Sequence, residues 1–109
     1  MLLMKLIPVV AVIILFPVSV AMAEGDPVRG KLLAETDCAD CHGDDGLGDY
    51  DRPPIAGMNP KEHIKELMNY KTGKRKDENE DMDMADLSEQ DMADVAAYYA
   101  SLPPPPQKQ

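Results

Sequence analysis

The stretch Cys38-Ala39-Asp40-Cys41-His42 contains both cysteines of the 109-residue chain. Cys-x-x-Cys-His is the pattern by which a c-type haem is attached to a protein. Two thiols at this spacing can reach the two vinyl groups of one porphyrin, and the next residue can present its imidazole to the iron. The stretch therefore predicts one covalently bound haem c, with Cys38 and Cys41 as attachment points and His42 as the proximal iron ligand.

Three other uses of a Cys-x-x-Cys pair explain the sequence less well. A thioredoxin-like redox site is expected next to a βαβ pattern, which the sequence lacks. A structural zinc site needs a second pair of ligands, such as another Cys-x-x-Cys or two closely spaced histidines, and neither follows. A disulfide is possible in an exported protein, but it gives no reason for the adjacent His42.

The composition also favours a large apolar cofactor. The whole chain has one Phe, four Tyr and no Trp, so its own side chains make a thin core. Domains of this size bury little surface and usually need disulfides, a metal or a cofactor. The formal net charge of −9 argues against binding to nucleic acid or anionic lipid surfaces. It is compatible with protein partners that carry basic docking patches.

The first residues have the features of a secretory signal peptide. A single lysine precedes the apolar run Leu6–Val20, and Ala21-Met22-Ala23 follows it, which is an A-x-A cleavage pattern. We predict that residues 1–23 are removed and that the mature protein is periplasmic. An uncleaved membrane anchor is the alternative. The run is short for a spanning helix, which needs roughly 20 apolar residues, and Pro8 and Pro17 interrupt it.

Two helix starts are marked by a capping residue followed by proline. Asp26-Pro27 should open a helix that runs to about Thr36, and Asn59-Pro60 should open one that ends near Gly73. The side chains expected to face the core are Val28, Leu32 and Leu33 in the first helix and Ile64, Leu67 and Met68 in the second.

A third helix should begin at Ser88, where Asp91 three residues later completes a form of the capping box. Its expected inward stripe is Met92, Val95, Ala96 and Tyr99. Residues 37–58 and 74–86 show little periodicity and should form long loops, and the proline-rich tail 103–109 should be disordered. There is no convincing strand pattern, so the fold class expected is all-α.

Five separated motifs resemble those of the class I c-type cytochromes, including small bacterial members and the cytochrome subunits of flavocytochrome sulfide dehydrogenases. The motifs are Gly30-Lys31 with Cys38–Gly46, Pro53-Pro54-Ile55-Ala56-Gly57, Tyr70–Arg75, Leu87–Met92 and Ala97-Tyr98-Tyr99. The resemblance implies a cytochrome c domain over residues 24–102, with three main helices around one haem c.

The resemblance also implies roles for individual residues around the haem. The backbone carbonyl of Pro53 should accept a hydrogen bond from the His42 imidazole and fix its orientation. Gly30 and Tyr98 should meet where the first and last helices cross, because a glycine lets an aromatic ring approach the backbone.

The distal iron ligand is the weakest part of the match. In similar sequences a methionine occupies the position of Glu80, and a carboxylate is a poor ligand for an electron carrier. Met84 next to Ala85 resembles a non-ligating methionine of this loop, so Met82 is the predicted ligand and Met84 the alternate. Met58, Met68, His63 or an open site also stay open. For His63, an exposed position or one beside a haem propionate is favoured over iron ligation.

The predicted function is electron transfer by a monomeric, non-enzymatic carrier that exchanges electrons with protein partners. One alternative is a haem subunit of a periplasmic oxidoreductase that acts on sulfide or thiosulfate, such as a flavocytochrome sulfide dehydrogenase. Another is a five-coordinate haem that binds small ligands. The sequence identifies neither the electron donor nor the acceptor.

The signal-peptide hypothesis predicts that the exported protein begins at Glu24. Intact-mass spectrometry of the periplasmic fraction should give the mass of residues 24–109 plus one haem. Ala23→Leu places a bulky side chain at the cleavage position and should leave the precursor unprocessed. Recovery of wild-type protein that retains Leu6–Val20 in the membrane fraction would support the anchored alternative.

Overall fold

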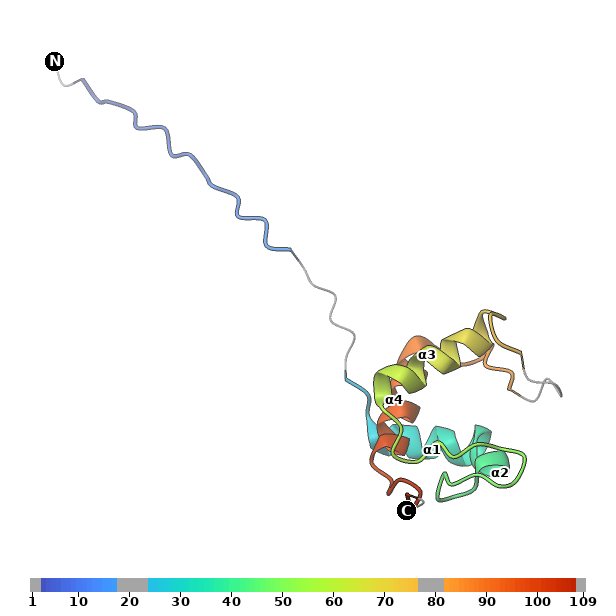
Figure 1. The fold of residues 1–109 in the computed structure, drawn as a ribbon. Coiled ribbons are helices and arrows are strands. Elements are labelled where there is room, and N and C mark those ends of the chain that lie inside the picture. The colour runs from blue at the N-terminus through green and yellow to red at the C-terminus, as the bar shows by residue number, and fades with distance from the viewer. Residues whose placement is uncertain (1–2, 18–23, 77–81, 108–109) are drawn as a thin grey trace.

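The computed structural model describes residues 3–17, 24–76 and 82–107, and within these ranges the only regular secondary structure is helical. The helices are α1 (Pro27–Asp37), α2 (Ala39–His42), α3 (Pro60–Lys71) and α4 (Glu89–Ala100). In Figure 1, α4 lies between α1 and α3, and both of these helices pack against it. The predicted all-α fold with three main helices is confirmed, and α2 is a single additional turn at the cysteine motif.

All three long helices begin at the predicted capping residues. The carboxylate of Asp26 and the amide oxygen of Asn59 each accept hydrogen bonds from the backbone N–H groups of the second and third residues of their helices. Ser88 and Asp91 form the full capping box, with each side chain bonded to the other's backbone N–H at 3.0 Å. Caps of this kind contribute about 1 kcal/mol each and fix where a helix starts.

The core-facing side of α1 differs from the prediction. Val28 and Leu32 are 74% and 64% exposed, and Leu33 is half-buried. The buried residues are Gly30 and Ala34, one helical turn apart. A Cβ atom on Gly30 would overlap the backbone carbonyl of Asp94 in α4. The helices therefore approach through small residues, and this close contact turns the larger side chains of α1 outward.

The contact expected between Gly30 and Tyr98 stays a prediction. The atoms nearest to a Cβ on Gly30 belong to the backbone of Asp94 and Val95. Tyr98 is half-buried, and its ring lies against that of Tyr99 with centroids 5.1 Å apart. The glycine is needed because a helix backbone approaches it there.

The apolar stripe of α4 agrees with the prediction. Its four members, Met92, Val95, Ala96 and Tyr99, are all buried. In α3, Leu67 is buried as predicted, whereas Ile64 and Met68 are half-buried. The core is thus a layer along α4, covered on one side by α1 and on the other by α3.

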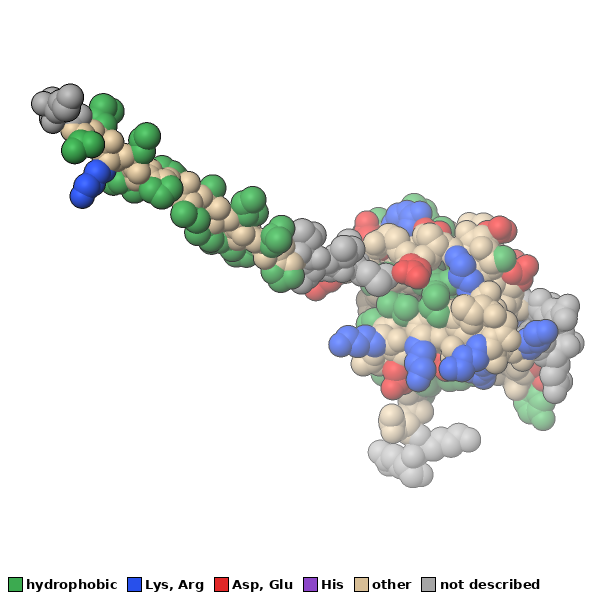
Figure 2. All heavy atoms as spheres, turned by 90° about the horizontal axis from the view of Figure 1, so that it is seen from above, with side chains coloured by type: hydrophobic (Ala, Val, Ile, Leu, Met, Phe, Trp, Pro, Cys, Tyr) green, Lys and Arg blue, Asp and Glu red, His purple; other side chains and the backbone are tan. Residues whose placement is uncertain are grey.

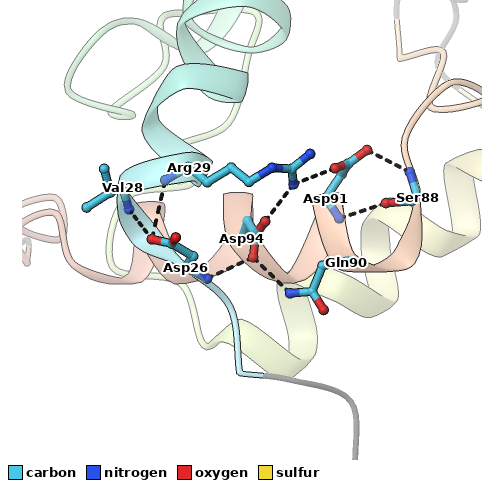
Figure 3. A network of polar contacts seen from close by, with 7 residues as sticks. All are labelled: Asp26, Val28, Arg29, Ser88, Gln90, Asp91 and Asp94. Atoms are coloured by element: carbon cyan, nitrogen blue, oxygen red, sulfur yellow. Dashed lines mark hydrogen bonds and ion pairs between the residues drawn. The ribbon is translucent and has the colours of Figure 1, made fainter.

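A network of polar contacts joins the start of α1 to α4 (Figure 3). The carboxylate of Asp94, 1% exposed, accepts hydrogen bonds from the backbone N–H of Asp26 at 2.8 Å, from Arg29 at 2.7 Å and from Gln90 at 2.9 Å. Arg29 also pairs with Asp91 at 2.6 Å. Burial alone would raise the pKa of Asp94, but these donors outweigh it and hold that pKa below its ordinary value.

The two ends of the described chain have no regular secondary structure. Residues 3–17 form an extended stretch in Figure 1, and Figure 2 shows its apolar side chains uncovered. Within the described ranges, no helix has both the length and the apolar character needed to cross a membrane. After α4, Pro104 lies against Gly57, where a Cβ would come within 2.7 Å of the proline side chain. Disorder of the tail stays a prediction.

The Asp94 network gives a stability prediction. Asp94→Asn keeps the size of the side chain but removes its charge, and should lower the free energy of unfolding by roughly 2 kcal/mol, the scale of hydrogen bonds to a charged group. Because folding lowers the pKa of Asp94, its stabilisation is complete above the ordinary carboxyl pKa of about 3.9 and is lost as the pH falls through the folded value.

Guanidinium unfolding at neutral and acidic pH measures both effects. The gap between wild type and Asp94→Asn should be largest near neutral pH and should shrink in acid. Asp86→Asn, which changes an exposed carboxylate before α4, is the matched control and should cost little. A gap for Asp94→Asn that is unchanged in acid would contradict the assigned role of this carboxylate.

Candidate functional site

A cavity of about 550 Å³ lies between α3, the turn at α2 and the loops that precede α3 and α4. The predicted site residues that line it are Cys38, Cys41, His42, Pro53, Met82 and Met84. Residues far apart in the sequence thus converge on one space. Met58 and His63 line the cavity as well. Met68 packs against the core and is not among the lining residues.

The single turn of α2 brings both thiols and the imidazole to the same wall. Cys38 lies between α1 and α2, and its carbonyl accepts hydrogen bonds from the backbone N–H groups of Cys41 at 3.2 Å and His42 at 3.0 Å. Residues three and four positions apart share a face of such a turn. This geometry explains why the Cys-x-x-Cys-His spacing can present three groups to one ligand.

The two thiols have different surroundings. Both are free, Cys38 is buried and Cys41 is half-buried. Burial raises the pKa of the Cys38 thiol to about 11, and the neighbouring carboxylate of Asp37 adds to the rise. The Cys38 side chain is set in an apolar cluster with Leu67, Val95 and Tyr99.

The imidazole of His42 is buried and oriented by the backbone. Its Nδ1 lies 3.0 Å from the carbonyl oxygen of Pro53, the contact that the resemblance implied. When Nδ1 donates to this carbonyl, Nε2 is the nitrogen available as a metal ligand.

A compact loop holds the Pro53 carbonyl in place. The carbonyl of His42 accepts a hydrogen bond from Gly48, and that of Gly46 accepts hydrogen bonds from Ile55 and Ala56. Gly46 has a φ of 69°, and a side chain there would collide with the ring of Tyr99. The glycines therefore let the loop fold back onto α4 and return Pro53 to the imidazole.

The loop before α4 supplies two sulfur atoms to the cavity. Met84 is 5% exposed and belongs to the hydrophobic core, whereas Met82 is half-buried and packs against that core. Both side chains line the cavity together with Met58. Glu80, which aligns with the usual ligand position, lies outside the described residues.

His63 does not take the exposed position that was one of the two favoured for it. Its side chain is 4% exposed and lines the cavity, and its Nδ1 has no hydrogen-bond partner among the described residues. Burial lowers the pKa of His63 to about 4, with a further contribution from His42. The burial of His63 could have been predicted from its spacing, because it lies one helical turn from the inward-facing Leu67 on α3.

The rim of the cavity contains charged residues that the sequence analysis did not assign to the site. Arg75 forms an ion pair with Glu66, and its guanidinium lies 5.3 Å from the ring centre of Tyr70. All three residues line the cavity, as does Arg52 from the opposite loop. Tyr70 and Arg75 belong to a motif that carried the resemblance, but the motif gave no role for either side chain.

These residues fit a haem. The volume lies within the range of roughly 300–1,000 Å³ typical of cofactor pockets. Its wall combines apolar side chains with two free thiols, an oriented imidazole, methionine sulfurs and cationic groups at the rim. Thiols can bond to the vinyl groups, nitrogen and sulfur atoms are haem-iron ligands, and cations complement the propionates.

Comparison with known proteins extends the likeness beyond this site. A cytochrome c4 from Thiocapsa roseopersicina is 36% identical over 83 residues, which make up 75% of this chain and 43% of the relative. The chain thus spans less than half the length of this relative. A cytochrome c-554(547) from Halothiobacillus neapolitanus is 34% identical over 89 residues, covering 72% of this chain and 98% of its own length.

A solved structure has the same fold. The thiosulfate dehydrogenase TsdBA from Marichromatium purpuratum, in its as-isolated form, superposes with a TM-score of 0.65 and 31% identity over 72% of this chain and 19% of its own. The sequence model of the family described as cytochrome c matches residues 27–103, from the start of α1 to beyond the end of α4. The chain therefore belongs to the cytochrome c family, whose members carry covalently bound haem c.

Proposed function

We propose that this protein is an electron carrier of the periplasm that holds one electron on a single haem c. Thioether bonds to Cys38 and Cys41 attach the haem, and His42 is the proximal iron ligand. The observation that carries the proposal is the convergence of both thiols and the imidazole on one wall, with His42 Nδ1 bonded to Pro53. This bond supports Nε2 as the ligand atom and holds the ring in one orientation.

We assign Met82 as the distal ligand. Met82 and Met84 come from the same loop, but Met84 is already buried in the core with Leu87 and Met92. Met82 is half-buried, so its sulfur can approach an iron without removal of a core side chain. A methionine opposite the histidine raises the reduction potential, which suits a carrier.

The surroundings of the site favour electron transfer over catalysis. Two protein ligands leave the iron no position for a substrate, and a six-coordinate iron changes oxidation state with little rearrangement. The chain's contribution is to bury the haem, set its potential through the axial ligands and leave a porphyrin edge for exchange with other redox proteins.

A second candidate is a haem subunit of an oxidoreductase. The likeness to part of the thiosulfate dehydrogenase TsdBA favours it, because this chain covers 19% of that structure. A stable complex with a catalytic subunit on purification would support the subunit role. Isolation as a monomer that exchanges electrons with several soluble proteins would support the free carrier.

The attachment proposal predicts the behaviour of cysteine variants. Cys38→Ala and Cys41→Ala should each leave at most one thioether bond, and the double variant should release its haem into acidic organic solvent. The pyridine haemochrome spectrum should move to the position of a haem with one unreacted vinyl group in each single variant. A double variant that retains covalent haem would contradict the proposal.

The distal assignment predicts opposite results for two methionines. Met82→Ala should remove the weak sulfur-to-iron absorption band at the red end of the oxidised spectrum and lower the reduction potential. Met84→Leu nearly conserves volume, should keep both properties and should cost under about 1.5 kcal/mol of stability. Loss of the band in Met84→Leu and its survival in Met82→Ala would reverse the assignment.

A further inference from the structure

One polar group in the cavity wall has a hydrogen-bonding requirement that the described residues do not meet. The side chain of His63 is 96% buried, and its Nδ1 has no hydrogen-bond partner in this part of the chain. A buried polar atom without a partner loses its hydration and gains nothing in return. Within the described residues, the imidazole therefore lacks one polar partner.

Helical spacing directs this ring toward the cavity. His63, Leu67 and Tyr70 are four and then three positions apart on α3, so they share a face, and all three line the cavity. The His63 ring also lies against the ring of Tyr99, with centroids 5.7 Å apart and planes at 49°. Packing from α4 thus supports the imidazole in the wall.

The protonation of the ring decides which partner it can take. A neutral imidazole carries one N–H group and one nitrogen lone pair, and either ring nitrogen can hold the proton. With the proton on Nδ1, His63 donates to an acceptor, and with the proton on Nε2, Nδ1 can accept a hydrogen bond or bind a metal.

A haem offers two kinds of partner for such a ring, the iron and the propionate carboxylates. Methionine sulfurs already line the cavity and can serve the iron. A carboxylate is stabilised by hydrogen-bond donors. His63 lies in the first turn of α3, where the positive end of the helix dipole favours an anion. Arg52 and Arg75 line the same cavity together with three acidic residues, and their guanidinium groups are further donors for a carboxylate.

We propose that His63 donates its imidazole N–H to a propionate carboxylate of the haem and acts as a positioning residue for the cofactor. The proposal rests on the haem site described above and adds a role for α3, which supplies neither a thiol nor the proximal ligand. A hydrogen bond to the propionate draws negative charge away from the iron. It therefore favours the reduced state and raises the reduction potential.

Three variants of the holoprotein test this role. His63→Phe removes the donor but keeps a ring, His63→Gln keeps an N–H donor, and Met68→Leu is a volume-conserving control on the same helix outside the cavity lining. Resonance Raman spectra of the propionate-bending mode and the reduction potential are the readouts. We expect His63→Phe to shift the propionate band and lower the potential, His63→Gln to restore most of both, and Met68→Leu to change neither.

The alternatives give different spectra. A propionate band that is the same in all variants would overturn the proposal, although haem attachment would survive. Loss of a low-spin, six-coordinate iron in His63→Phe would show instead that His63 is an iron ligand. Absence of covalent haem from the wild-type protein would mean that the proposed function itself had failed.

A measurement on the wild-type protein does not depend on any variant. In the reduced protein labelled with nitrogen-15 histidine, His63 should show one imidazole N–H that is protected from exchange and shifted downfield, as expected for a donor to a carboxylate. A His63 ring with no protected N–H would overturn the proposal, even if His63→Phe fails to fold.

Discussion

The close contact between Gly30 and the Asp94 peptide is the constraint on which the rest of the structure depends. The absence of a side chain at Gly30 lets α1 and α4 approach at the backbone, and the Asp94 carboxylate then bonds to the N-terminal end of α1. α1 leads directly into Cys38, and Tyr99 lies five residues beyond Asp94 on α4. The crossing therefore sets the first thiol against Tyr99, and with it the turn that holds Cys41 and His42.

Features that depend on neighbouring residues could be predicted from the sequence, whereas contacts between distant residues, such as Gly30 and Asp94, could not. The helix starts were predictable because a cap is a local interaction between residues two or three positions apart. The stripe on α4 was predictable because that helix is covered on both sides. Val28 and Leu32 were predicted to face the core because a hydrophobic pattern places the large apolar side chains inside. In the structure, α1 contacts α4 through Gly30 and Ala34, because small residues let the two helix backbones come close together.

In the candidate site too, local features could be predicted from the sequence and tertiary ones could not. Cys38, Cys41 and His42 form one local motif, and their spacing alone places them on the same face of a helical turn. The rim residues Arg52 and Arg75 come from two loops, and only the tertiary fold brings them to one cavity. The spacing from Leu67 indicates that His63 is buried, but only the packed structure shows that its Nδ1 has no partner among the described residues.

Covalent attachment of haem also bears on how so small a chain remains folded. The largest fully buried side chains are Tyr99, Met92, Val95 and Asp94, all of them on α4, so the other helices contribute little bulk to the core. A cofactor held only by noncovalent contacts stabilises the fold in proportion to the logarithm of its concentration relative to its dissociation constant. Thioether bonds remove that dependence, because the haem then belongs to the chain in the unfolded state as well. The apolar surface of the porphyrin can therefore act as the part of the core that the amino-acid composition lacks.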